Sequence, residues 1–137
     1  MLEALVGLII FAVGILGLIG LQMASIKQAS EAEYRSVAAL QANDLISRMW
    51  VSDRTAATLQ LQFASPDGAG YIAWKDEWAG ALPNTATHAP TVSFTTVDGG
   101  GATPVSSSQV EVKVFWKSPG EKADDPAHSY TTVAQLK

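Results

Sequence analysis

The feature that most constrains this chain is an uninterrupted apolar run over residues 4–21, in which no side chain is polar or charged. An α-helix rises about 1.5 Å per residue, so a run of this length covers the roughly 30 Å hydrocarbon core of a bilayer. The run is apolar on every side, unlike the single apolar stripe of a helix on the surface of a soluble domain. We therefore predict that Met1 to Met23 form a membrane-spanning helix.

Two simpler roles would also explain a run of this kind. A secretory signal peptide has a basic start, a shorter apolar stretch and a small-residue cleavage site. Here the start carries Glu3, the apolar stretch is longer, and no A-x-A cleavage site follows it, which argues against a signal peptide. A plain membrane anchor stays open as the second alternative.

Glu3 is the single charge at the start of the run, and glycines recur within it at Gly7, Gly14, Gly17 and Gly20. A carboxylate at membrane depth is costly unless it is protonated or paired. The dipole of a first helical turn favours a carboxylate but does not replace a counter-ion. We therefore expect a positive partner from outside this segment, such as the N-terminal amine of a neighbouring copy. The glycines would allow close helix packing or local unwinding.

The length and charge of the chain exclude several classes of protein. With 137 residues, it is long enough for one small domain and one long element, but not for two full cores. The net charge of −4 provides no general attraction to nucleic acid, so direct nucleic-acid binding is not expected. The chain has no cysteine, which excludes disulfides, thiolate metal sites and cysteine nucleophiles.

The helical pattern continues beyond the apolar run, because no proline or glycine occurs between Gln22 and Arg54. Apolar residues recur there at three- and four-residue spacing, which is typical of an amphipathic helix. This stripe comprises Tyr34, Ala38, Ala42, Leu45 and Met49, widened by Val37, Ile46 and Trp50. We predict one helix over residues 2–53, about 78 Å long, whose second half packs on a soluble domain.

The remaining residues predict a small sheet after a loop and a short helix. We expect a loop over 55–70, a short helix over 71–82 that Pro83 ends, and strands over 91–97, 109–117 and 129–136. Glycine-rich residues 98–101 begin the first strand connection, and 118–128 form the second. The predicted fold is α+β: a three-stranded antiparallel meander on the amphipathic half of the long helix. The domains would be 1–23 for the apolar half and 24–137 for the globular part, the latter divided into 24–54, 55–83 and 91–136.

No other residues form a convincing chemical site. His88 and His128 stand alone in predicted loops without metal-ligand spacing, Ser106 to Ser108 lack the context of a nucleophile, and Asp124 and Asp125 indicate a solvated turn. Four tryptophans could form a binding patch, although core packing is the more common role of such residues: Trp50, Trp74, Trp78 and Trp116. We expect no metal site, no cofactor and no enzymatic activity.

At its N-terminus the chain resembles the type IV pilin family, which includes the pseudopilins of type II secretion. The resemblance rests on Met1-Leu-Glu-Ala-Leu-Val-Gly-Leu-Ile9 and the glycine-punctuated apolar helix behind it. Within the family, the chain is most similar to minor pilins of the PilV type. That likeness rests on Gly14-Ile-Leu-Gly-Leu-Ile-Gly-Leu-Gln22, Tyr34-Arg-Ser-Val37, Ala42-Asn-Asp-Leu-Ile-Ser-Arg-Met49, Ala81-Leu-Pro83, Val110-Glu-Val-Lys-Val-Phe-Trp116 and Val133-Ala-Gln-Leu136.

The resemblance implies a ladle-like pilin fold and a role in filament assembly. Pilins are held in the inner membrane by this helix, with the globular domain in the periplasm, until they polymerise into a cell-surface pilus. The glutamate that matches Glu3 neutralises the N-terminal amine of an adjacent subunit, and Gly14, Gly17 and Gly20 lie where pilin helices loosen. The implied partners are the major pilin, other minor pilins, the inner-membrane assembly platform, prepilin peptidase and, before assembly, the lipid bilayer.

The chain departs from the family pattern in two respects. Mature pilins begin with an N-methylated phenylalanine and carry the glutamate fifth, whereas Glu3 is third here. Either the sequence starts at an internal methionine or two residues are missing, and we expect a leader and further mature residues ahead of Met1. The C-terminal cysteine pair of many major pilins is also missing, which favours a minor pilin.

The function we predict is therefore that of a minor pilin that helps initiate a type IV pilus or occupies its tip. Motility, adhesion or DNA uptake would then belong to the pilus as a whole. Two alternatives stay open. One is a type II secretion minor pseudopilin, and the other is a membrane-anchored periplasmic binding module that does not polymerise.

Overall fold

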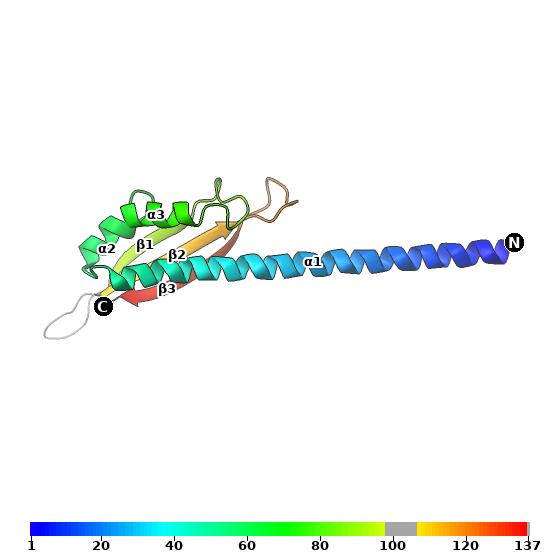
Figure 1. Cartoon of the computed structure of the whole chain (residues 1–137), viewed down its shortest axis with the longest axis horizontal. Coiled ribbons are helices and arrows are strands. Elements are labelled where there is room, and N and C mark those ends of the chain that lie inside the picture. The colour runs from blue at the N-terminus through cyan, green and yellow to red at the C-terminus, as the bar shows by residue number, and fades with distance from the viewer. Residues whose placement is uncertain (98–106, 137) are drawn as a thin grey trace. The chain divides into compact units, whose positions relative to one another are not determined.

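The computed structural model describes residues 1–97 and 107–136, and Figure 1 shows its elements. In chain order they are α1 (Leu2–Val51), α2 (Ala56–Phe63), α3 (Ala69–Glu77), β1 (Thr91–Val97), β2 (Ser107–Trp116) and β3 (His128–Leu136). The predicted α+β class is confirmed, because a long N-terminal helix packs on a three-stranded antiparallel sheet. The predicted connection at 98–101, Ser106 and the side chain of Ser107 lie outside the described residues.

The chain divides into two compact units, Met1–Glu33 and Tyr34–Lys137, and α1 contributes residues to both. The predicted helix over 2–53 is confirmed except at its end, which falls at Val51. Beyond that point, the Asp53 carboxylate accepts hydrogen bonds from the backbone N–H and the hydroxyl of Thr55. This turn competes with continued helix, because a short carboxylate bonded to backbone two residues ahead favours a turn.

The sheet has the predicted order β1-β2-β3, with both pairs antiparallel. Val112 in the central strand lies opposite Val92 on one side and Thr132 on the other. Side chains alternate between the two faces of a strand, so Val110, Val112, Val114 and Trp116 share one face, and all four are buried. The strand predicted over 109–117 is therefore confirmed, with its bounds at Ser107–Trp116.

The core of the Tyr34–Lys137 unit lies between this face of the sheet and the helices. Its buried apolar residues are Ala38, Ala42, Leu45, Met49, Leu59, Phe63, Tyr71, Trp74, Leu82, Val92, Val110, Val112, Val114, Trp116 and Leu136. The predicted stripe on α1 supplies the first four of them. Trp50, expected to widen that stripe, is instead 45% exposed, with the guanidinium of Arg54 5.7 Å from its ring.

One predicted loop was wrong, because α2 forms within the segment 55–70. Leu59 and Phe63 lie four residues apart and are both buried, so this short helix is stabilised by one apolar edge packed into the core. The next helix is also displaced from its predicted range of 71–82. It runs over Ala69–Glu77 with Trp78 as its C-cap, and Gly80 in the turn that follows has φ +85°, a left-handed conformation that suits glycine.

Gly68, between α2 and α3, is required by a close approach of the backbone. A Cβ atom at this position would lie 2.5 Å from the carbonyl oxygen of Gln62 and 2.8 Å from that of Ala64. Backbone atoms cannot move aside as a flexible side chain can. The tight connection between the two short helices therefore depends on a residue without a side chain.

Candidate functional site

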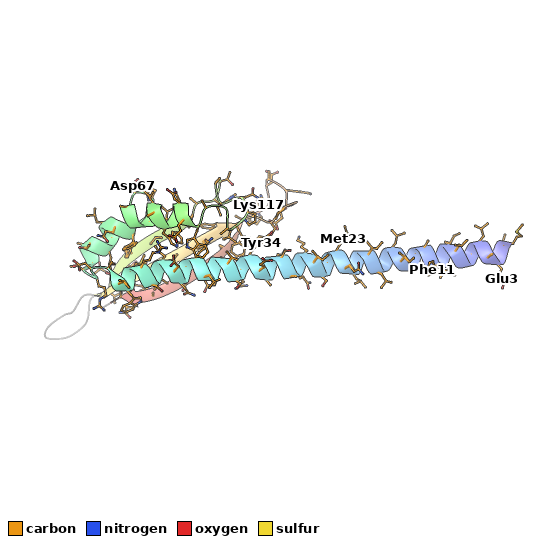
Figure 2. The ribbon with its side chains drawn as sticks, viewed as in Figure 1. Glu3, Phe11, Met23, Tyr34, Asp67 and Lys117 are labelled. Atoms are coloured by element: carbon orange, nitrogen blue, oxygen red, sulfur yellow. The ribbon has the colours of Figure 1, made fainter. Side chains whose placement is uncertain are left out.

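The first candidate site is the apolar part of α1 within the Met1–Glu33 unit. None of its most apolar window is buried, and the helix is long and apolar enough to span a membrane. Figure 2 shows side chains such as Phe11 and Met23 projecting from the helix, and these two are 67% and 70% exposed. Exposed apolar surface of this extent is typical of a segment that contacts lipid or other protein chains.

Glu3 lies in the first turn of this helix and is exposed. Within residues 1–97 and 107–136, no cationic group forms an ion pair with its carboxylate. The described part of this chain therefore supplies no cationic partner for Glu3. A carboxylate at the edge of an apolar segment is available to a cation on another molecule.

The four glycines of the run have no packing role that the described residues explain. A Cβ atom added at Gly7, Gly14, Gly17 or Gly20 would meet nothing within 4 Å. Glycine lowers helix stability by about 1 kcal/mol relative to alanine, so its recurrence here carries a cost. The remaining physical uses are close approach to another helix and local unwinding, and these stay predictions.

A second cluster, within the Tyr34–Lys137 unit, joins the amphipathic part of α1 to α3. Arg48 lies 2.9 Å from the Asp44 carboxylate and 2.6 Å from the Glu77 carboxylate. The indole N–H of Trp78 donates to the same Asp44 oxygen at 3.1 Å. The pKa of Arg48 is raised, chiefly by its hydrogen bond to Glu77. All three ionic side chains are partly exposed, so these ion pairs orient α3 on α1 and contribute little to stability.

The two histidines differ from each other in the structure. His88 lies in the predicted loop, with its Nδ1 2.9 Å from the Thr87 hydroxyl. His128 is not in a loop as predicted but begins β3, where its ring stacks on Trp116 at 5.8 Å. Its Nε2 lies 2.8 Å from the Glu121 carboxylate. The pairing of β2 with β3 sets His128 opposite Trp116 and so positions this imidazole.

The predicted turn at Asp124 and Asp125 is present, and both residues are exposed. The Asp125 carboxylate accepts a hydrogen bond from the backbone N–H of Lys122. The ammonium of the buried Lys117 donates hydrogen bonds to the carbonyl groups of Ala123 and Asp125, at 2.7 and 2.9 Å. The loop is thereby tied to the end of β2, which explains why a lysine is buried there.

Gln41 was missed at the sequence level, although a signal for it exists. It lies on α1 three residues after Ala38 and four before Leu45, so it falls on the apolar stripe, and it is only 3% exposed. A polar residue at a buried helical position is a candidate for structural or binding hydrogen bonds.

No protein-family model, curated protein or solved structure matches this chain. The resemblance to type IV pilins therefore rests only on the residues quoted in the sequence analysis, and the family stays a prediction.

Proposed function

We propose that this chain is a structural subunit of a type IV pilus, a minor pilin that helps initiate assembly or occupies the pilus tip. The observation that carries the proposal is the exposed apolar half of α1, with Glu3 at its start and no cationic partner for it in the described chain. The resemblance of the N-terminal residues to pilins supports the same function.

The physical argument begins with the exposed apolar surface. Leu5, Leu8 and Ile10 are 60%, 68% and 68% exposed, and transfer of such side chains from water to an apolar environment is favourable by about 25 cal/mol per Å². Lipid covers this surface in a membrane, and neighbouring helices cover it in a filament. The same helix can therefore occupy a bilayer before assembly and a filament core after it.

Glu3 favours the filament over a simple anchor. An ionised carboxylate gains nothing from burial in lipid, and breaking a buried pair by removing one partner is strongly destabilising. A neighbouring subunit that supplies its N-terminal amine would neutralise Glu3 as the helices bundle. In a plain anchor the helix dipole alone would favour the carboxylate, and this is a weaker stabilisation than a paired cation provides.

The proposal also specifies location and partners. The chain would span the inner membrane once, with the Tyr34–Lys137 unit in the periplasm, and would then enter a surface pilus. Its partners would be the major pilin, other minor pilins, the assembly platform and prepilin peptidase. A minor pseudopilin of type II secretion would show the same helix and the same carboxylate, so recovery in surface pili is the observation that separates the two.

The test replaces Glu3 with alanine in the native host and uses Glu33→Ala as the matched control. Glu33 is an exposed glutamate on the same helix, outside the apolar run. We expect Glu3→Ala to remain in the membrane fraction but to be lost from sheared pili, while Glu33→Ala enters pili like the parent chain. Carbodiimide should also cross-link Glu3 to the N-terminal residue of a neighbouring subunit, identified by mass spectrometry.

Equal recovery of Glu3→Ala and the parent chain in sheared pili would contradict the assembly role of Glu3. A parent chain that stays in the membrane and never enters a filament would instead favour the non-polymerising binding module.

A further inference from the structure

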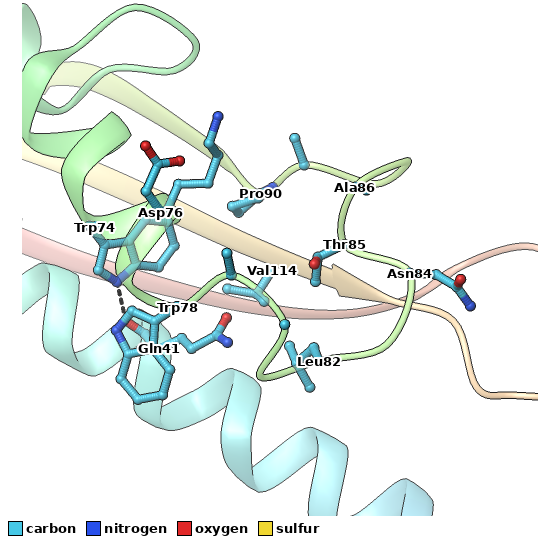
Figure 3. A pocket seen from close by; sticks show the side chains of 14 residues that line it. Gln41, Trp74, Asp76, Trp78, Leu82, Asn84, Thr85, Ala86, Pro90 and Val114 are labelled. Atoms are coloured by element: carbon cyan, nitrogen blue, oxygen red, sulfur yellow. Dashed lines mark hydrogen bonds between the residues drawn. The ribbon is translucent and has the colours of Figure 1, made fainter.

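A cavity of about 520 Å³ lies within the Tyr34–Lys137 unit, between α1, α3, β2 and the 79–90 loop, and Figure 3 shows the side chains that line it. The Nε2 atom of Gln41 has no hydrogen-bond partner among the described residues, but it is itself enclosed, so a molecule in the cavity could not bond to it. The lining therefore selects no particular ligand. The edges of the sheet make a more specific demand, because an edge strand presents a row of backbone donors and acceptors.

The edge of the sheet at β1 is covered by the chain itself. The backbone N–H of Val92 donates to the Ser65 hydroxyl at 3.0 Å, and the Val92 carbonyl accepts a hydrogen bond from the backbone N–H of Ser65 at 3.2 Å. The connection between α2 and α3 thus occupies this edge. Because Val92 bonds to Ser65, its backbone groups point away from β2.

This direction fixes which backbone groups of β3 face outward. In an antiparallel pair, successive residues of a strand turn their N–H and C=O groups alternately toward the partner strand and away from it. Val92 lies opposite Val112, so the groups of Val112 point toward β3, where it lies opposite Thr132. The groups of Thr132 therefore bond to β2, and those of Thr131 and Val133 point outward.

The outward groups of β3 have no partner in the described part of the chain. Within residues 1–97 and 107–136, no hydrogen bond joins the backbone of Ser129, Thr131 or Val133 to a residue outside the sheet. All three residues are exposed, and Figure 1 shows β3 at the margin of the sheet. Each of them supplies one donor and one acceptor, so the free groups recur at the spacing of an extended strand.

This edge also lacks the features that usually keep sheet edges from pairing, which are charges, prolines, bulges and a short strand. Residues 129–136 include no charged side chain, no proline and no glycine. The strand is nine residues long, and its register with β2 has no bulge. The central strand β2, by contrast, carries Glu111 and Lys113. An edge of this kind is suited to the addition of another strand.

We infer that β3 binds an extended, uncharged segment of another protein, which adds to the sheet as a fourth, antiparallel strand. An extended backbone is the partner that matches a row of alternating donors and acceptors, and antiparallel pairing is the more stable arrangement. Side chains of the added strand on the inner face lie beside Tyr130 and Ala134, which are partly buried against the core, so apolar residues suit these positions. Side chains on the outer face lie beside Thr131 and Val133, where β-branched residues such as threonine pack well.

A second copy of this chain is a poorer occupant of the edge. Its β1 is covered at Val92, and two β3 strands paired antiparallel are related by a two-fold axis normal to the sheet. That axis sets the parts of α1 that pack on the two sheets in opposite directions, whereas copies anchored in one membrane share one direction. Only this exclusion uses the proposed membrane location, because the edge itself belongs entirely to the Tyr34–Lys137 unit.

The test uses the ¹⁵N-labelled full chain in micelles and the peptide acetyl-Lys-Thr-Val-Thr-Val-Thr-Lys-amide, whose terminal lysines keep it soluble. In the added strand, the threonines lie on the outer face and bond to β3, while the valines turn their N–H groups away. One peptide therefore carries N-methyl groups on both valines, which leaves its bonding edge intact and prevents further peptides from stacking on it. The matched control peptide carries N-methyl groups on two of the threonines instead.

We expect the valine-methylated peptide to protect the amide protons of Thr131 and Val133 from hydrogen exchange. In the chain alone these protons should exchange faster than those of Thr132 and Ala134, which bond to β2. The threonine-methylated peptide should bind about five-fold more weakly or worse, since one net hydrogen bond supplies roughly this ratio.

Two variants identify the edge within the chain. Thr131→Pro removes an N–H that points outward, so it should abolish peptide binding and keep the pairing with β2. Val133→Lys adds a charge at the exposed edge and should weaken peptide binding several-fold. Gln109→Lys, exposed on the outer face of the central strand, is the matched control and should bind as the parent chain does. Val133→Lys decides the outcome if Thr131→Pro fails to fold.

Several results would overturn the inference. They are equal binding of the two methylated peptides, no protection of β3 by either peptide at millimolar concentration, protection confined to amides outside β3, and peptide binding by Val133→Lys equal to that of the parent chain. Amides of Thr131 and Val133 that are already protected in the dilute chain would show that the edge is covered. Protection that rises with the concentration of the chain alone would assign the edge to a second copy instead of another protein.

Discussion

The Met1–Glu33 and Tyr34–Lys137 units use apolar residues in opposite ways. In the first, Leu16 is 68% exposed and Leu18 is 62% exposed, whereas Leu45 in the second has no exposed surface, although all three belong to α1. The second unit buries one stripe of the helix against its own sheet. The first is apolar all round, so no single face could bury it within a chain of this size. A segment of this kind obtains its apolar contacts from lipid or other chains.

The largest expected effect comes from the same substitution made in both units. Leu45→Ala should lower the free energy of unfolding of the Tyr34–Lys137 unit by about 2–5 kcal/mol, because it leaves a cavity in the core. Leu16→Ala should leave that free energy unchanged, since its side chain is exposed in the first unit. Denaturant titration of the full chain in micelles, followed by tryptophan fluorescence, measures both. Equal destabilisation by the two variants would remove the distinction between the units.

A second pair of variants sharpens the comparison at glycine. Gly68→Ala should destabilise the Tyr34–Lys137 unit by about 1–3 kcal/mol, because the new Cβ meets the Gln62 carbonyl oxygen at 2.5 Å. The Cβ atom of Gly14→Ala would meet nothing within 4 Å, so this variant should leave the free energy of unfolding of the Tyr34–Lys137 unit unchanged. The same denaturant titration applies. A neutral Gly68→Ala would show that the connection between α2 and α3 has room to move.

A smaller effect is expected at the ionic cluster between α1 and α3. Arg48→Met removes the partner of Asp44 and Glu77 but keeps much of the apolar stem of the side chain. Because the arginine is 34% exposed and solvent screens its pairs, the loss should be about 0.5–1 kcal/mol. Raising the salt concentration should reduce the difference between the parent chain and the variant. A difference that does not change with salt would indicate lost packing rather than lost charge.

The smallest effect concerns the turn that follows α1. Hydrogen bonds from the Thr55 hydroxyl and backbone N–H lower the pKa of Asp53 from its ordinary value of 3.8. A lowered folded-state pKa stabilises the fold above the unfolded pKa, and this contribution is lost as the pH falls through the folded pKa. Thr55→Val removes the hydroxyl donor, so the pKa of Asp53 should rise, as measured by an NMR titration of its carboxyl carbon. An unchanged pKa would mean that the backbone N–H suffices.

Much of the fold could be predicted from local pattern. The unbroken run at 4–21, the spacing of Ala38, Ala42, Leu45 and Met49, and the alternation in β2 each have one period that dominates, and the structure follows all three. The segment containing α2 was predicted as a loop, because eight residues with two buried anchors give a weak periodic signal. Such a short helix forms when the core supplies a surface for Leu59 and Phe63.

The sequence by itself determined that residues 4–21 form a run long and apolar enough to span a membrane, because none of their side chains is polar or charged. It also placed Glu3 at the start of that run, with no lysine or arginine among residues 1–26. Only the tertiary structure decided which tryptophans are buried, that Gln41 is enclosed without an acceptor for its Nε2, and that a cavity opens beside it. Burial and hydrogen bonding depend on which segments meet in space, and residues as distant as Gln41 and Val114 share a wall only after the chain has folded.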